Sequence, residues 1–353
     1  MPPTALADGH LIIHVLNVGA GDSIVIEFPR ESGGEKKLGI VDCYKSAKTV
    51  DYVKAIAQIR PYTEVAFVCA THPHYDHVAG IQTLLTTPET RPTEFWDSGF
   101  RHQTVTYQRI LETVASQGIR MERVSSGMER YFGPVRLTAL APSIALRNRY
   151  ATYGVDVNNA SIVLRLEYCS QDAVTVQSLR YSGKRDVDLE RSTPTSVAIL
   201  GADAEFDSWS KVAEEFPYLH KTSKHSPLVN KVVNLLNCHF LKISHHGSMH
   251  STPLDVLESM SPALAAASNK QELSSLSTPH GTFQRNLFPH DICVLALREV
   301  KAKICTTDGS LAHGEPTWKR PGSIVAGFFS SGSRGAVKLD DDVNTVPAPP
   351  THM

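Results

Sequence analysis

Three histidines and one aspartate directly follow a continuous apolar segment in the first third of the chain. The run from Val65 to Ala70 contains no charged residue, which is typical of a strand buried on both faces of a sheet. It continues as Thr71-His72-Pro73-His74-Tyr75-Asp76-His77. Imidazole and carboxylate groups crowded onto a loop at a strand end suit zinc, manganese or iron. A chance histidine-rich surface turn is the alternative, and the preceding strand argues against it.

Charge and size restrict the classes of protein to consider. Lys plus Arg (35) nearly balance Asp plus Glu (36), so no global field draws the chain onto nucleic acid or an anionic membrane. Any nucleic-acid contact must come from a local patch. With 353 residues, 41% of them hydrophobic, the chain can bury a sizeable core in one large α/β domain or two small ones.

The cellular location is predicted to be cytoplasmic. The stretch from Met1 to His10 lacks the basic and apolar segments of a secretory signal. No apolar run approaches the roughly 18 residues of a membrane span, so no membrane insertion is expected. The six cysteines are scattered without C-x-x-C spacing, which predicts buried thiols in a reducing compartment.

Short apolar runs between turns predict a chain of mixed strands and helices. We expect strands at 11–16, 23–28, 38–42, 65–70, 135–140, 161–168, 196–200, 238–243 and 263–267, and helices at 50–59, 107–116, 206–216 and 253–260. We predict one hydrolase domain over residues 1–335, with a polar insertion at 171–195. Residues 336–353, with their acidic and proline-containing stretches, are predicted to form a disordered tail.

The spacing of the first cluster resembles the H-x-H-x-D-H motif of the metallo-β-lactamase superfamily. The resemblance implies an α/β fold, a four-layer αββα sandwich, that holds two divalent metal ions. Zinc is the first expectation, with manganese or iron as alternatives. Within the superfamily, the chain most resembles the soluble hydrolase domain of bacterial DNA-internalisation competence proteins. Val18-Gly19-Ala20-Gly21-Asp22-Ser23 is similar to their V-G-Q-G-D-[SA] turn, and His245-His246-Gly247-Ser248 to their H-H-G-S element.

This resemblance implies a set of metal ligands. It assigns His72, His74, Asp76, His77, Asp203 and His246. Asp203 would bridge the two metals, although Ala202 stands where the family usually has glycine, and a helix N-cap is the alternative role for this aspartate. Asp76 and His245 are the predicted catalytic residues, with His245 as proton donor or phosphate contact. Which of His245 and His246 is the ligand stays open.

Further residues are expected behind the metals or against the substrate. The resemblance places Asp42 at a strand end as support for the ligands, with an ordinary turn aspartate as the alternative, and Asp22 in a similar position. Asn159 and Ser161 orient water or substrate, or else cap a strand. His280 replaces a family histidine or lies on the surface. The third histidine that many relatives supply to the first metal is missing near Asn159, so this metal is expected to be open or water-filled.

The leading functional hypothesis is a phosphodiesterase or nuclease that acts on nucleic acid or nucleotide-like substrates through a metal-activated water. A basic groove, to which Arg147, Arg149, Lys221, Lys224 and Lys242 could contribute, would favour it. An apolar pocket beside the metals would favour the alternative, a carboxylic ester, lactone or thioester hydrolase. A third hypothesis is a regulatory module with a decayed site. The competence proteins' membrane channel is absent, so DNA uptake would need a protein partner; the oligomeric state is open.

Overall fold

The computed structural model describes residues 9–31, 34–146, 156–169, 194–216, 236–269, 276–278, 281–283, 288–312, 316–329 and 332–339. One sheet has eight strands in the order β17 (Arg334–Lys338), β16 (Ile324–Phe329), β1 (His10–Val15), β2 (Ser23–Glu27), β3 (Lys37–Cys43), β4 (Glu64–Ala70), β5 (Pro92–Asp97) and β6 (Arg120–Arg123). β1 to β3 form the expected antiparallel hairpins, whereas β3, β4, β5 and β6 run parallel to one another.

A second sheet has seven strands in the order β15 (Lys303–Thr306), β12 (Leu264–Ala267), β11 (Phe240–Lys242), β10 (Pro194–Leu200), β9 (Val163–Cys169), β8 (Val135–Ala141) and β7 (Glu129–Phe132). β10, β11, β12 and β15 are parallel, and β7, β8, β9 and β10 pair antiparallel. A separate hairpin joins β13 (Leu276–Thr278) to β14 (Gly281–Phe283).

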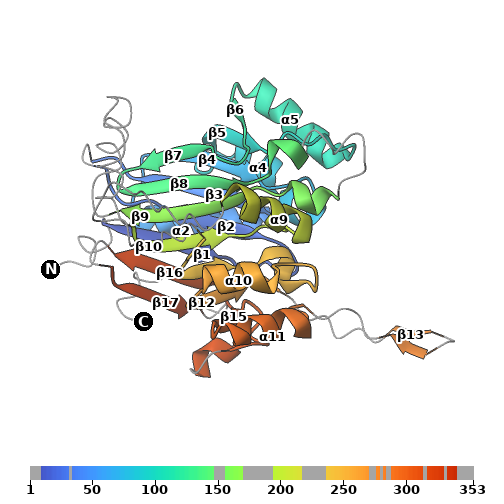
Figure 1. Ribbon diagram of the computed structural model, residues 1–353. Helices are drawn as coiled ribbons and strands as arrows, with labels where there is room; N and C mark the ends of the chain where they lie inside the picture. Colours follow the sequence, from blue (N-terminus) through green and yellow to red (C-terminus); the bar gives the residue numbers. More distant parts are fainter. Residues whose placement is uncertain are drawn as a thin grey trace, which may run out of the picture.

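The helices lie outside the two sheets (Figure 1). They are α2 (Ser46–Ile59), α3 (Tyr75–Val78), α4 (Ile81–Thr86), α5 (Val105–Ser116), α9 (Phe206–Glu215), α10 (Leu254–Met260) and α11 (Asp291–Glu299), with short 3-10 turns η1 (Val157–Ala160), η2 (Ser244–Gly247) and η3 (Pro316–Lys319). No helix in these described ranges is both long and apolar enough to cross a membrane.

Three apolar layers show how sheets and helices stack. Because successive side chains of a strand point to opposite faces, Ile13 and Leu166 meet in a core between the two sheets. Ile40 packs instead with Val53 of α2 on the outer face of the first sheet. The outer face of the second sheet packs in the same way against α9, α10 and α11. The predicted four-layer αββα sandwich is confirmed.

Element boundaries differ from expectation at a few points. β10 begins at Pro194, so the last two residues of the predicted polar insertion belong to a strand, and the rest of it lies outside the described residues. The folded domain also extends past residue 335, because β17 pairs with β16 as far as Lys338. The predicted tail from residue 340 onward lies outside the described residues. Cys43, Cys69, Cys238, Cys293 and Cys305 are buried free thiols.

Loops that follow parallel strands of both sheets meet at one edge, where open α/β sheets usually bind ligands. The amide of Asp22 donates to the carbonyl of Asp76 at 3.1 Å, and that of Ile162 to Thr71 at 3.0 Å. The amide of His245 donates to the carbonyl of Ala202 at 2.7 Å. These backbone bonds tie the loop after β4 to the β1–β2 loop and to the residue before β9, and they tie the loops after β10 and β11 to each other.

Candidate metal centre

The loop after β4 delivers its histidines and aspartate at the start of a short helix. His74 is the N-cap of α3, and Asp76 and His77 lie in that helix. His72 and His77 are buried, whereas the Asp76 side chain is 38% exposed. The first motif therefore offers buried imidazoles beside one carboxylate that solvent can reach.

Asp203, in the loop after β10, presents its two carboxylate oxygens to different imidazoles. Its Oδ1 lies 3.2 Å from His77 Nε2 and 3.9 Å from His246 Nε2. Its Oδ2 lies 3.8 Å from the Nε2 atoms of both His72 and His245. The carboxylate thus stands between two groups of ring nitrogens, as a bridging ligand would.

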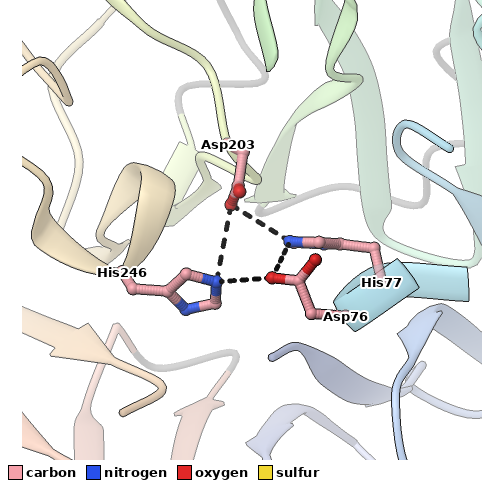
Figure 2. A group of neighbouring side chains, drawn as sticks. All are labelled: Asp76, His77, Asp203 and His246. Carbon is pink, nitrogen blue, oxygen red and sulfur yellow. Dashed lines mark ion pairs between the residues drawn. The ribbon is translucent and has the colours of Figure 1, made fainter. Parts of the chain in front are cut away.

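Four of these side chains form a compact group. Figure 2 shows Asp76, His77, Asp203 and His246 pointing toward one another, and one ligand atom from each lies within 4.8 Å of all the others. Asp76 Oδ2 is 3.5 Å from His246 Nε2 and 3.7 Å from His77 Nε2. Two ligands bonded to one zinc at roughly 2.0–2.2 Å cannot be more than about 4.4 Å apart. These separations therefore fit a shared ion.

Unsatisfied polar atoms point to the same conclusion. His72 Nε2, His77 Nε2, His246 Nε2 and Asp203 Oδ1 are buried without a hydrogen-bond partner. Buried polar atoms are rarely left unpaired, because losing water without a replacement bond costs free energy. A divalent cation would satisfy several of these atoms at once, so the residues present fit a metal.

The opposite ring nitrogens are held by neighbours that fix how each imidazole is turned. His246 Nδ1 donates to the carbonyl of Ser268 at 3.0 Å. His77 Nδ1 lies 2.7 Å from Asp42 Oδ2, and Asp42 also accepts bonds from the amide and hydroxyl of Thr71 at 2.8 and 2.7 Å. Such outer contacts direct Nε2 toward a metal, and the supporting role of Asp42 stays a prediction that this contact is compatible with.

Local electrostatics keep two of the candidate ligands, His72 and Asp203, in their coordinating forms. Burial and the nearby His77 ring lower the pKa of His72 well below its ordinary value, which leaves a neutral ring with a free lone pair. Burial alone would raise the pKa of Asp203, but His77 and His246 outweigh it and hold that pKa well below the usual range. Asp203 is therefore ionised.

Asp22 and Lys242 form a buried ion pair beside the site. Lys242 Nζ lies 2.8 Å from Asp22 Oδ2, and neither side chain is exposed. Asp22 Oδ1 lies 3.8 Å from His246 Nδ1. Asp22 therefore stands behind His246, and the prediction that Lys242 contacts phosphate is wrong, because its ammonium group cannot reach solvent.

Other predicted residues belong to the scaffold or lie outside the described ranges. Asn159 Oδ1 accepts from the amide of Ser208 in the first turn of α9 at 3.0 Å, so its side chain contacts a helix end and not the strand that was its capping alternative. Ser161 Oγ accepts from the amide of Asp203 at 3.2 Å and so helps to place that carboxylate. His280, residues 171–193 of the predicted insertion, and the basic residues predicted at 147, 149, 221 and 224 lie outside the described residues.

Glu205 is a site residue that sequence reasoning missed. Its Oε1 lies 2.8 Å from His245 Nδ1 and accepts from Asn158 Nδ2 at 3.2 Å. The available sign was a second carboxylate two residues after Asp203. Nothing in that spacing, however, indicates which histidine it contacts.

Strained backbone gathers around the same residues. Asp42, Ala202, His245 and His246 have positive φ angles of 57°, 46°, 45° and 52°. Residues other than glycine rarely adopt this left-handed conformation, and those that do cluster at functional sites. Ala202 therefore adopts a conformation that glycine would take more easily.

Ala202→Gly should be better tolerated than Ala204→Gly. Both alanines are buried, so each change removes a methyl group and loosens the unfolded chain, but only Ala202 is left-handed. We expect the free energy of unfolding of the Ala202→Gly variant to be about 1–2 kcal/mol higher than that of the Ala204→Gly variant. Urea denaturation of both variants measures the difference; equal stabilities would contradict the strain.

Gly21→Ala should disturb Asp76. A Cβ at this position would lie 2.6 Å from the Asp76 carbonyl oxygen and 2.6 Å from the Tyr44 ring, so the loops must separate. We expect a loss of about 1–3 kcal/mol in unfolding free energy and weaker metal binding. Gly9→Ala is the control, because nothing lies within 4 Å of its added Cβ. Equal metal content and thermal stability in both variants would contradict this.

Comparison with known proteins gives distant structural likenesses. No family model matches the chain, and no curated protein matches it. The metallo-beta-lactamase fold protein YhfI from Bacillus subtilis aligns at a TM-score of 0.40 and 10% identity, over 84% of this chain and 96% of its own. A mutant of the CmlA beta-hydroxylase aligns at 0.39 and 10%, over 83% of this chain and 52% of its own.

A diphosphatase of the PhnP family aligns at a TM-score of 0.35 and 11% identity, over 73% of this chain and 85% of its own. This chain thus spans about half the length of the hydroxylase and most of the other two proteins. Likenesses this distant carry no argument about activity. The αββα sandwich rests on the chain's own sheet order and its three apolar layers.

Proposed function

We propose that this chain is a metal-dependent hydrolase, and specifically a phosphodiesterase that binds two divalent ions, zinc in the first instance. The observation that carries the proposal is the placement of Asp203, whose two oxygens each face two imidazole nitrogens at 3.2–3.9 Å. The expected second-metal ligands are Asp76, His77 and His246, and His72 and His74 stand on the first-metal side.

Bound divalent ions would supply a Lewis acid and lower the pKa of a water toward neutrality. The protein's own residues do the positioning. Asp203 keeps the two ligand groups together, and Asp42 and the Ser268 carbonyl hold His77 and His246 in place. The partly exposed carboxylate of Asp76 is the group that can meet substrate and accept a proton from an attacking water. No serine or cysteine nucleophile is required.

An exposed arginine near the candidate ligands supports a phosphate-containing substrate. The loop after β5 carries Arg101 and His102, and the His102 ring lies 6.4 Å from the His74 ring. Arg101, His102, Gln103 and Thr104 line a hollow of about 500 Å³. A guanidinium group binds phosphate oxygens in a two-pronged manner. The likeness of the H-H-G-S element to DNA-internalisation hydrolase domains supports the same substrate class.

A second cavity, of about 590 Å³, bears on the ester alternative. It is lined by Asn17, Val18, Gly19, Asn269, Asp308, Gly309, Ser310 and Pro321. Among the described residues, this lining holds no large apolar side chain of the kind that a lactone or thioester with a hydrocarbon chain would need. The carboxylic ester hydrolase is therefore kept only as one possible outcome of the hydrolysis experiment below.

Hydrolysis by zinc- or manganese-loaded protein tests the proposal. The substrates are bis-p-nitrophenyl phosphate, single-stranded DNA and double-stranded DNA, with p-nitrophenyl acetate and a lactone alongside. We expect metal-dependent phosphodiester turnover that His74→Ala abolishes and that a change at the exposed His250 leaves intact. Turnover of acetate or lactone alone by fully metallated protein would replace the phosphodiesterase with the ester hydrolase.

Arg101→Ala should raise KM for the phosphodiester by about tenfold or more. A hydrogen bond to a charged group is worth roughly 1.5–3 kcal/mol, and each 1.4 kcal/mol is a factor of ten. Arg109→Ala, which removes an exposed arginine from α5, is the matched control. Steady-state kinetics with the metallated variants gives KM. Identical KM values for both variants would show that Arg101 does not bind the substrate.

A further inference from the structure

The two oxygens of Asp203 are unequally supplied with predicted ligands. On the Oδ1 side, His77, His246 and Asp76 complete a compact group. On the Oδ2 side, the sequence provides His72 and His74 but no histidine near Asn159, where relatives carry a third one. The first metal would therefore be short of a protein ligand unless another residue supplies it.

His245 lies on the side of Asp203 that lacks a third histidine. Its Nε2 lies 3.8 Å from Asp203 Oδ2, the same distance as His72 Nε2. Both separations are below the limit of about 4.4 Å for two ligands of one ion. The two imidazoles thus face the same carboxylate oxygen, while the adjacent His246 serves the other.

Local structure fixes this orientation of His245. The residue has a φ angle of 45°, and its amide donates to the carbonyl of Ala202 at 2.7 Å. Its Nδ1 lies 2.8 Å from Glu205 Oε1, which leaves Nε2 aimed at Asp203. The left-handed turn at two successive histidines sends their side chains to the two sides of one carboxylate.

We propose that His245 is the third imidazole ligand of the first metal, in place of the histidine missing near Asn159, and that Glu205 is its positioning residue. The inference rests on the proposed two-metal site. A carboxylate that holds the remote nitrogen of a metal-bound histidine is a recurrent arrangement, and it fixes the ring and increases its basicity. His72, His245 and Asp203 do not form a compact group of the kind that Asp76, His77, Asp203 and His246 form among the described residues, so the proposal requires the two rings to approach each other when the metal binds.

Metal stoichiometry tests the proposal without reference to activity. Protein that a chelator has freed of metal is titrated with zinc by calorimetry. Bound zinc is counted by elemental analysis after gel filtration. His245→Asn is the principal variant, because asparagine tolerates the left-handed backbone. We expect two zinc ions in the parent chain, one in His245→Asn, and two in His250→Ala, which changes an exposed histidine five residues along.

Glu205→Ala separates positioning from ligation. We expect it to retain two zinc ions, with affinity at the first site weakened by about 10–100-fold and the second site unchanged. Glu205→Gln, which can still accept from Nδ1, should restore most of that affinity. Cobalt substitution adds a spectroscopic check, because loss of a nitrogen ligand changes the visible absorption of one ion only.

Several outcomes would overturn the proposal. Two zinc ions bound with unchanged affinity in His245→Asn would return His245 to a proton-donor or phosphate-contact role. A single zinc ion bound by the parent chain would show that the first-metal site does not exist. By contrast, the expected stoichiometries together with no phosphodiester turnover would uphold His245 as a ligand while the phosphodiesterase proposal fails.

Discussion

Asp203→Ala should empty the metal centre and reduce hydrolysis by at least about a thousandfold. The change removes the carboxylate that faces four imidazole nitrogens at 3.2–3.9 Å. Without bound metal, the water pKa returns from about 7 toward 15.7, and several kcal/mol of charge stabilisation are lost. A thousandfold decrease corresponds to only about 4 kcal/mol in the barrier, so this expectation is conservative.

Metal content and kinetics should be measured together for this variant. Asp207→Ala is the matched control, because it removes an exposed carboxylate from the first turn of α9, four residues away. Asp203→Asn keeps the side-chain shape without the charge, and near-ultraviolet circular dichroism reports whether each variant is folded. Two bound metals and near-normal turnover in Asp203→Ala would exclude a bridging role for this residue.

The fold was largely predictable because most elements carry their own periodic or apolar pattern. The continuous apolar run before the histidines forms the buried β4. Val50, Val53 and Ile56 of α2 pack on the first sheet, whereas Ile59, which continues the same helical spacing, is 41% exposed. Several strands were missed, among them the interior strands β5 and β16 and the edge strand β6. β6 shows mostly exposed side chains, so no hydrophobic pattern marks it. β17 was assigned in part to a tail because its order depends on pairing with β16.

The candidate ligands were predictable from motifs, whereas their supporting contacts were not. His72 to His77 form a local pattern that any fold must keep together. The Lys242–Asp22 pair instead joins residues 220 positions apart, and a lysine before the H-H-G-S element gives no sign of burial. Glu205 was missed for a similar reason, since its partner His245 comes from the turn η2 that follows another strand, β11. Long-range partners require the fold itself.

A buried charge cluster on the first sheet was equally hidden in the sequence. Glu27 of β2 is fully buried, with its carboxylate 2.8 Å from His14 Nε2 and 2.9 Å from Lys36 Nζ. Arg60, at the end of α2, donates to both carboxylate oxygens at distances from 2.6 to 3.1 Å. His14 Nδ1 in turn lies 2.9 Å from the Tyr52 hydroxyl. One carboxylate therefore serves as the acceptor for two buried cations.

Glu27→Ala should lower the free energy of unfolding by about 3–5 kcal/mol at pH 7, because Lys36 and Arg60 would stay buried without their counterion. Burial would raise the pKa of Glu27, but hydrogen bonds from His14 and Arg60 outweigh it and hold that pKa below its ordinary value. A carboxyl group whose pKa is lower in the folded protein than in the unfolded chain contributes its full stabilisation at pH values above the unfolded pKa of about 4.3. This contribution decreases as the pH falls from there toward the pKa of the folded state.

The stability difference between parent and variant should therefore shrink below about pH 4. Urea denaturation at pH 7 and at pH 3.5 measures it, with Glu27→Gln to separate charge from shape and Glu112→Ala, on the exposed face of α5, as the control. A difference below about 1 kcal/mol at pH 7 would mean that the cluster's desolvation cost cancels its attraction. A difference that is large but independent of pH would assign the effect to packing rather than to the charge of Glu27.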